Sequence, residues 1–290
     1  MASDRTNNTL RLRDGRQLGY AEFGDPHGKP LFLFHGSPGS RLEGWFADAA
    51  AARRGIRVLA FDRPGFGLSD FKPGRAIADW PEDMVQAADA LGIERFAVLG
   101  LSGGGPHVAA CALKVPQRLT AAGIVSGVGP FDAPRATQGM MGWLRLLMRL
   151  ARALPWAVRP VMWLLGSITR HFAKRFIALQ SRSGAQSDRA VLARPDLRAW
   201  AVQGVAEPFR RGGRGAAWEL TLLARPWGFR PEDITMEIHL WQGEADVMVP
   251  PSMGRYQAQA FPNCRARFYP GEGHLMIAGH MEEILGALFP

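Results

Sequence analysis

The chain of 290 residues contains few cysteines and no long hydrophobic run. Its 2 cysteines, Cys111 and Cys264, are too few for a disulfide framework, so we expect both thiols to be reduced. No apolar stretch approaches the ~18 residues that a transmembrane helix needs. The first eight residues lack the hydrophobic segment of a secretory signal. Together these absences predict a folded cytoplasmic protein.

Lysine is also scarce, since only 4 of the 35 basic residues are lysines. The charge is unevenly distributed: residues 131–230 carry 17 Lys and Arg against 5 Asp and Glu, whereas the rest of the chain carries 18 against 21. The basic segment is rich in Trp and Leu, which a folded domain needs for packing, and it contains no nucleic-acid-binding motif. The sequence therefore predicts no nucleic-acid partner.

Outside the basic segment, short apolar runs alternate with helical stretches. Strands are expected at residues 9–13, 17–23, 31–34, 57–61, 95–99, 121–125, 237–241 and 265–269. Helices are expected at residues 79–91, 106–113, 253–261 and 277–288. This alternation is typical of an α/β fold with a mostly parallel, twisted sheet and helices on both faces.

The alternation of strands and helices stops in the basic segment. Residues 131–230 have a helical pattern in which arginine, tryptophan and leucine are abundant. Expected strands resume after this segment and have the same character as those before it. We therefore expect one core domain formed by residues 1–130 and 231–290, interrupted by a helical insertion at residues 131–230.

A serine stands between an expected strand and an expected helix, in the sequence Gly100-Leu101-Ser102-Gly103-Gly104. A sharp turn at this position holds the serine hydroxyl at the end of a sheet, and the glycines allow the two elements to pack closely. Because the chain contains 34 glycines, the pattern alone has an appreciable chance of arising at random. It indicates a nucleophile only if the chain also supplies a base, an acid and an oxyanion site.

The residues expected to activate the serine follow the last two strands. A serine hydroxyl is a weak nucleophile and needs a neighbouring base. His274 lies in a glycine-rich loop after the final strand, and Asp246 follows the strand before it. Asp246 would hold the imidazole in the correct tautomer and stabilise the imidazolium. Glu244 and Asp132 are the alternative acids.

The loop after the strand at residues 31–34 is the expected oxyanion loop. An oxyanion site needs two backbone N–H groups that point at one position. The residue after the nucleophile, Gly103, supplies the first, and Ser37 is the expected second donor. Pro38 cannot take this role because it has no N–H group. This chemistry needs no metal ion or cofactor, and we expect none.

These motifs together resemble the α/β-hydrolase fold superfamily, of the type with a serine nucleophile and a helical cap, over nearly the whole chain. The matching motifs lie at residues 35–39, 62–69, 100–104, 243–250 and 271–274. The resemblance implies that residues 62–69 form a structural loop near the site. Haloalkane dehalogenases and epoxide hydrolases carry an aspartate where this chain has Ser102. Proline-releasing peptidases of this fold often carry a tryptophan where it has Gly103.

The resemblance also implies that the insertion at residues 131–230 is a cap over the active site. Within it, residues 133–187 contain no Asp or Glu, and Arg145, Arg149 and Arg152 share one helix face. Three interpretations remain open. The arginines are a solvent-facing surface of a packed cap, a weak contact with an anionic membrane surface, or a site for an anionic group of the substrate.

Taken together, these motifs predict a cofactor-free serine hydrolase that cleaves carboxylic esters through an acyl-enzyme. The apolar cap indicates a small-molecule substrate with an apolar acyl or aromatic part. Amide hydrolysis, C–C bond hydrolysis and perhydrolysis use the same residues and remain alternatives. A non-catalytic ligand receptor and a membrane-surface protein are alternatives of another class. The sequence indicates no oligomeric state.

Overall fold

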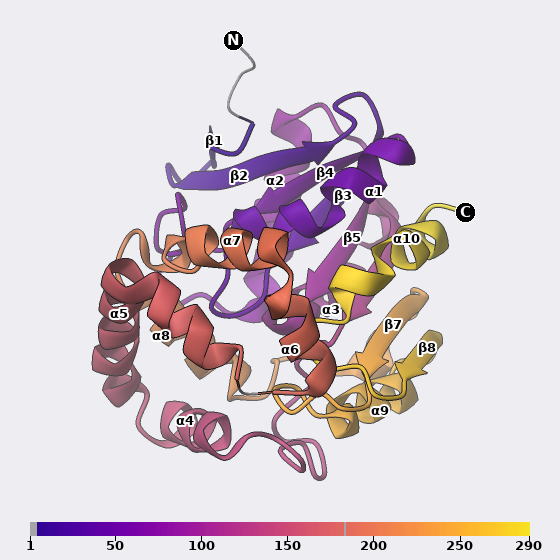
Figure 1. Ribbon diagram of the computed structural model, residues 1–290. Helices are drawn as coiled ribbons and strands as arrows, with labels where there is room; N and C mark the ends of the chain where they lie inside the picture. The colour runs from indigo at the N-terminus through magenta and orange to yellow at the C-terminus, as the bar shows by residue number, and fades with distance from the viewer. Residues whose placement is uncertain (1–4, 183) are drawn as a thin grey trace.

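The computed structural model describes residues 5–182 and 184–290 (Figure 1). Its centre is an eight-stranded sheet with the order β1-β2-β4-β3-β5-β6-β7-β8. β1 and β2 are antiparallel to their neighbours, and the other strands are parallel. The strands are β1 (Asn8–Arg11), β2 (Gln17–Gly24), β3 (Lys29–Phe34), β4 (Ile56–Phe61), β5 (Phe96–Leu101), β6 (Leu119–Val125), β7 (Ile238–Gly243) and β8 (Cys264–Tyr269).

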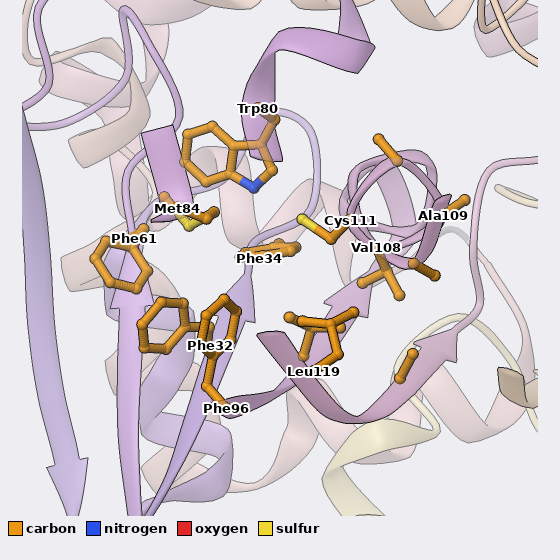
Figure 2. Packing of buried hydrophobic residues seen from close by; sticks show 14 of the residues in the cluster. Phe32, Phe34, Phe61, Trp80, Met84, Phe96, Val108, Ala109, Cys111 and Leu119 are labelled. Atoms are coloured by element: carbon orange, nitrogen blue, oxygen red, sulfur yellow. The ribbon is translucent and has the colours of Figure 1, made fainter. Parts of the chain in front are cut away.

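Helices cover both faces of the sheet, because its central strands are apolar on both sides. One face packs against α2 and α3, where Trp80 of α2 meets Phe34 of β3 with their ring centroids 5.5 Å apart, and Val108 of α3 belongs to the same apolar cluster (Figure 2). The rings of Phe32 and Phe96 stack with their centroids 4.0 Å apart. The opposite face packs against α1 and α10. The helices of the core are α1 (Asp48–Arg53), α2 (Trp80–Ala90), α3 (Gly105–Lys114), α9 (Pro251–Ala260) and α10 (Ile277–Leu288).

A group of five helices is inserted between β6 and β7, and we call it the cap. Figure 1 shows these helices gathered beside the sheet rather than on either of its faces. Their inner surfaces share a separate apolar cluster, in which Met148, Met162 and Leu220 of the cap meet Phe66 and Met253 of the core. The cap helices are α4 (Gly142–Ala153), α5 (Val158–Gln180), α6 (Gln186–Ala193), α7 (Pro195–Gly204) and α8 (Arg214–Leu223).

α5 is the longest helix, with 23 residues, and its backbone is kinked at Phe172. The helix also carries four charged side chains along its length, Arg159, Arg170, Lys174 and Arg175. In the two described stretches of chain, no helix has the length and apolar character required to cross a bilayer.

The α/β fold expected from the sequence is confirmed, including the mostly parallel sheet and the inserted helices. Each expected strand is present with small shifts at its ends. The division into residues 1–130, 131–230 and 231–290 stays a prediction, and the inserted helices themselves run from Gly142 to Leu223. Residues 1–4 of the expected core and residue 183 of the expected cap lie outside the described residues.

Candidate active site

Ser102 occupies a strained turn between β5 and α3. Its φ angle is +53°, in the left-handed region that non-glycine residues seldom adopt. A methyl group at Gly100 would lie 2.6 Å from the carbonyl oxygen of Gly104, and one at Gly104 would lie 2.2 Å from that of Phe34. Glycine is therefore required on both sides of Ser102, because β3, β5 and α3 approach each other too closely for a side chain.

His274 and Asp246 form a direct pair in the loops after β8 and β7. The Nδ1 atom of His274 lies 2.8 Å from Oδ2 of Asp246. The other carboxylate oxygen of Asp246 accepts hydrogen bonds from the N–H groups of Met248 (2.8 Å) and Val249 (2.9 Å). Because the paired carboxylate accepts the Nδ1 proton, the Nε2 atom of His274 is left free to accept another proton.

The two alternative acids lie elsewhere. Glu244 forms a surface ion pair with Arg255, and Asp132 is exposed to solvent. Neither side chain is hydrogen-bonded to His274 in the described part of the chain. Asp246 is therefore the carboxylate that the structure places on the imidazole.

The charges around His274 favour its protonated form. Burial alone would lower the pKa of His274, but the paired carboxylate of Asp246 and the charges of Asp188 and Glu43 raise it above its ordinary value of 6.5. An imidazole with a raised pKa is a stronger base, and it remains able to return its proton to a leaving group.

The two expected oxyanion donors, Ser37 and Gly103, lie against each other. A methyl group at Gly103 would lie 2.4 Å from Oγ of Ser37 and 2.8 Å from its Cβ. The N–H group of Ser37 donates to no backbone or side-chain acceptor in the described residues. Gly103 is the second residue of the helical turn that starts at Ser102, where backbone N–H groups have no partner within the helix. Both N–H groups are thus available to a ligand.

The five candidate residues share one edge of the sheet. Ser37, Ser102, Asp246 and His274 follow β3, β5, β7 and β8 respectively, and the carboxyl ends of parallel strands meet at one edge. The structure joins Asp246 to His274 and places Ser37 against Gly103. The Ser102 hydroxyl has no hydrogen-bond partner among the described residues.

Glu43, which the sequence motifs did not indicate, lies beside this group. Its Oε2 accepts a hydrogen bond of 2.7 Å from the N–H of Gly36, in the loop after β3. A methyl group at Gly36 would contact both the Ser102 Cβ, at 3.5 Å, and the Glu43 carboxylate oxygens, at 3.6 Å. Burial raises the pKa of Glu43 to about 7, against the lowering effect of its hydrogen bond with Gly36. The site therefore contains a second titratable group close to neutral pH.

A buried ionic network holds the loop after β3, which carries Ser37. Arg63, which follows β4, donates to the carbonyl oxygens of His35 (2.5 Å) and Gly36 (2.9 Å) and to Oγ of Ser37 (2.8 Å). The same guanidinium donates to Oε1 of Glu219, 2.7 Å away on cap helix α8. Ser37 Oγ also donates to Glu219, at 3.3 Å. The cap and the core thus hold this loop together.

Glu219 is charged although it is completely buried. Burial alone would raise the pKa of Glu219, but the guanidinium groups of Arg63 and Arg75 hold it below its ordinary value. Burial lowers the pKa of the neighbouring His107 to about 3, so His107 is neutral. Sequence analysis assigned residues 62–69 only a structural role. The only signal for Glu219 was that acidic residues are rare in the cap.

The cap also holds the loop that carries His274. The Asp188 carboxylate, near the start of α6, accepts from the N–H groups of His274 (3.1 Å) and Leu275 (2.8 Å). Ser187 Oγ accepts from the N–H of Gly273 at 2.8 Å. A methyl group at Gly273 would lie 2.4 Å from the Asp188 carboxylate. The position of His274 therefore depends on the docking of α6.

Access to these residues is narrow. Ser102 and His274 are only 8% and 7% exposed. A surface hollow of about 660 Å³ lies away from them, lined by His239 and Trp241, and none of the candidate residues contributes to it. The side chains of Ser102 and His274 are therefore almost completely shielded from solvent.

Neither cysteine belongs to the candidate active site. Cys111 and Cys264 are free thiols, in agreement with the expectation from composition. Burial raises the pKa of both, that of Cys264 to about 11. No group of three or more His, Cys, Asp or Glu within residues 5–182 and 184–290 is placed to hold a metal ion.

The chain is similar in sequence to curated proteins over part of its length. One is the dihydrolipoyllysine-residue acetyltransferase component of an acetoin cleaving system from Cupriavidus necator, 34% identical over 121 residues. Another is 3-oxoadipate enol-lactonase 1 from Acinetobacter baylyi, 31% identical over 93 residues. These matches cover 41% and 32% of this chain, and 32% and 35% of the relatives. The chain thus spans about a third of the length of each.

Similarity of fold extends over nearly the whole chain. An esterase from Exiguobacterium antarcticum superposes with a TM-score of 0.74 at 14% identity, covering 98% of this chain and 100% of the esterase. The alpha/beta hydrolase fold family matches residues 29–280, a range that contains Ser37, Ser102, Asp246 and His274. The chain therefore belongs to the alpha/beta hydrolase fold family, whose members are hydrolases.

Proposed function

We propose that this protein is a serine hydrolase of carboxylic esters that works through an acyl-enzyme and needs no cofactor. Ser102 would be the nucleophile, His274 the general base and acid, and Asp246 the residue that orients the imidazole. The N–H groups of Ser37 and Gly103 would hold the oxyanion. The substrate would be a small molecule with an apolar acyl or aromatic part.

The conformation of Ser102 carries this proposal. A serine held at φ +53° stores backbone strain, and strain of this kind concentrates at functional sites. The same sheet edge supplies a histidine paired to a carboxylate and the two neighbouring residues Ser37 and Gly103, each with a backbone N–H group. This combination supports nucleophilic acyl transfer, because each of the required chemical roles has a residue.

The proposed reaction has two halves. Ser102 Oγ attacks the ester carbonyl while His274 Nε2 takes its proton, and the carbonyl oxygen becomes an oxyanion held by Ser37 and Gly103. As the oxyanion collapses, the C–O bond breaks and His274 gives the proton to the leaving alcohol. Water then attacks the acyl-enzyme by the same path, and the carboxylic acid and free Ser102 are restored.

The preference for an apolar substrate rests on the cap residues nearest the oxyanion site. A methyl group at Gly103 would lie 3.2 Å from Cδ1 of Leu223 on α8. Leu220 and Phe66 belong to the same apolar cluster. An acyl chain bound to Ser102 would therefore meet hydrocarbon side chains, and each buried methylene contributes roughly 0.8 kcal/mol to binding.

A panel of aryl esters with increasing acyl length, together with the matching anilides, tests the proposed activity. We expect hydrolysis of the esters with a kcat/KM that rises with chain length until the closed site is filled. The anilides should be cleaved much more slowly. Activity on the anilides alone, or no activity on any ester, would contradict the proposal.

The rate of ester hydrolysis is expected to depend on the protonation of His274. Only the neutral imidazole can act as base, so kcat/KM should fall as the pH drops through the raised pKa of His274. Asp188→Asn removes one charge that raises this pKa, and the acid limb of the profile should therefore move to lower pH. The measurement is kcat/KM for one aryl ester as a function of pH.

Asp196→Asn is the matched control for this experiment. Asp196 also lies in the cap, but it is exposed and pairs with Arg194, so its replacement should leave the profile unchanged. An acid limb that stays in place in Asp188→Asn, or that moves equally in both variants, would show that Asp188 does not act on His274.

A further inference from the structure

The exposed large apolar side chains of this protein are concentrated in one part of the cap. All nine that the structure leaves exposed within residues 5–182 and 184–290 come from α4, α5 and the turn between them. Trp156 is 72% exposed, Leu179 69% and Leu146 68%. The complete set is Trp143, Leu146, Leu154, Trp156, Val161, Trp163, Leu164, Phe172 and Leu179. Such clustering differs from the scattered exposed apolar residues of an ordinary surface.

The same surface is strongly cationic. Residues 133–187 contain nine Lys and Arg and no Asp or Glu. The charged side chains between the exposed apolar ones are themselves exposed, and no acidic residue pairs with them in the described chain. These side chains are Arg145, Arg149, Arg152, Arg159, Lys174 and Arg175. We call the exposed apolar residues and these six cations the outer cap face.

The inner side of these helices is already used for packing. Met148 and Ala151 of α4 and Val158 and Met162 of α5 are buried in the cap cluster. α4 and α5 both contact α8, and Figure 1 shows them at the outer margin of the cap. The outer cap face is therefore the surface of α4 and α5 that stays exposed when their inner sides are packed. Its apolar residues are not needed to hold α4 and α5 in place.

The composition of the outer cap face fits the surface of an anionic bilayer. Tryptophan places its ring among lipid headgroups, and leucine enters the acyl boundary. Arginine and lysine keep their charges at the level of lipid phosphates while their stems lie along apolar surface. Anionic lipids attract cations placed near the membrane surface. Each of these residue types therefore has a favourable position at the surface of an anionic bilayer.

A second copy of the chain is a poorer occupant. An isologous contact places the same surface on both sides. Six unpaired cations of one copy would then face six of the other, and like charges across an interface oppose association. Because this face contains no carboxylate, the compensating negative charge has to come from another molecule.

We propose that the outer cap face binds the surface of anionic lipid bilayers and lays the cap of the enzyme against the membrane. The proposal does not depend on ester hydrolysis, because none of the residues involved belongs to the candidate active site. Binding would place α4 and α5 of the cap next to lipid.

Vesicle sedimentation tests this proposal directly. The probe is a set of vesicles of phosphatidylcholine and phosphatidylglycerol in a three-to-one ratio, compared with vesicles of phosphatidylcholine alone. The protein should sediment with the anionic vesicles at about 50 mM salt and be released at roughly 500 mM, where screening is much stronger. Ser102→Ala should bind as well as the wild type, which separates this test from that of the proposed activity.

Two variants of the outer cap face should lose binding by at least several-fold. One is the triple replacement Arg145→Gln, Arg149→Gln and Arg152→Gln, and the other is Trp156→Ser with Trp163→Ser. The matched control is Arg13→Gln, Arg230→Gln and Arg265→Gln, which removes the same charge from exposed positions elsewhere. That control should bind almost as well as the wild type.

Three results would overturn the proposal. The first is no sedimentation with anionic vesicles at the lower salt concentration. The second is equal loss of binding in the two arginine triples, which would show only an effect of net charge. The third is a concentration-dependent dimer in light scattering that the tryptophan replacements abolish, which would show that a second copy covers this face.

Discussion

Replacing Ser102 by alanine is expected to lower kcat for aryl esters by about 10⁶-fold, the order of magnitude found when a serine nucleophile is removed. The Ser102 hydroxyl is the group that would form the acyl-enzyme in the proposed mechanism. Its removal should leave the fold intact, because it makes no hydrogen bond with the described residues. Initial rates on one ester, with circular dichroism to verify folding, provide the measurement.

Ser126 provides a matched control for this substitution. It also follows a parallel strand, is completely buried and has a positive φ of +48°. Ser126→Ala repeats the chemical change and the backbone strain at the neighbouring strand end, since Val125 pairs with Leu101 in the sheet, but it leaves the proposed nucleophile in place. It should keep ester hydrolysis close to the wild-type rate. If Ser102→Ala kept a comparable rate while folded, Ser102 would not be the nucleophile.

Replacing Glu219 by glutamine is expected to have the largest effect on stability. The change leaves the guanidinium groups of Arg63 and Arg75 buried without their carboxylate. Removing one partner of a buried ion pair costs about 3–5 kcal/mol, so the free energy of unfolding should fall by this amount. Urea denaturation followed by circular dichroism measures the loss.

The activity of Glu219→Gln should fall as well, and mainly in kcat. Arg63 holds the carbonyl oxygens of His35 and Gly36, so loosening it would move the proposed oxyanion donors, which would act in the transition state. Glu237→Gln breaks the exposed ion pair with Arg265 and a contact of 3.2 Å with Nε2 of His239, and it should change stability by ~1 kcal/mol or less. A Glu219→Gln protein as stable as this control would contradict the role assigned to the network.

The sheet was predictable from the sequence because its buried strands are short, continuous apolar runs. The run at residues 31–34 is an example, and it forms the end of β3. The loops that carry Ser102, Asp246 and His274 were predictable for the same reason. Each follows an apolar run that forms a parallel strand, and the ends of parallel strands meet at one edge of the sheet. His274 and Asp246 do meet there, 2.8 Å apart. Their proposed roles remain to be tested.

The residues that hold these loops could not be predicted. Glu219 lies 182 positions from Ser37, and Asp188 lies 86 positions from His274. Each comes from a cap helix, and no local pattern shows how that helix docks on the core. Glu43 was missed for another reason: it follows the oxyanion loop by only a few residues, but its position beside Ser102 depends on how that loop turns back. Contacts of this kind are set by tertiary packing.

The most direct test of the account is covalent labelling with a fluorophosphonate, which reacts with an activated serine nucleophile, followed by mass spectrometry of the labelled peptides. We expect one adduct, on Ser102, in the wild type and in Ser126→Ala. The adduct should be absent in Ser102→Ala and should form more slowly in His274→Ala, where the base is missing. Ester hydrolysis with no label on Ser102, or with the label on another serine, would contradict it.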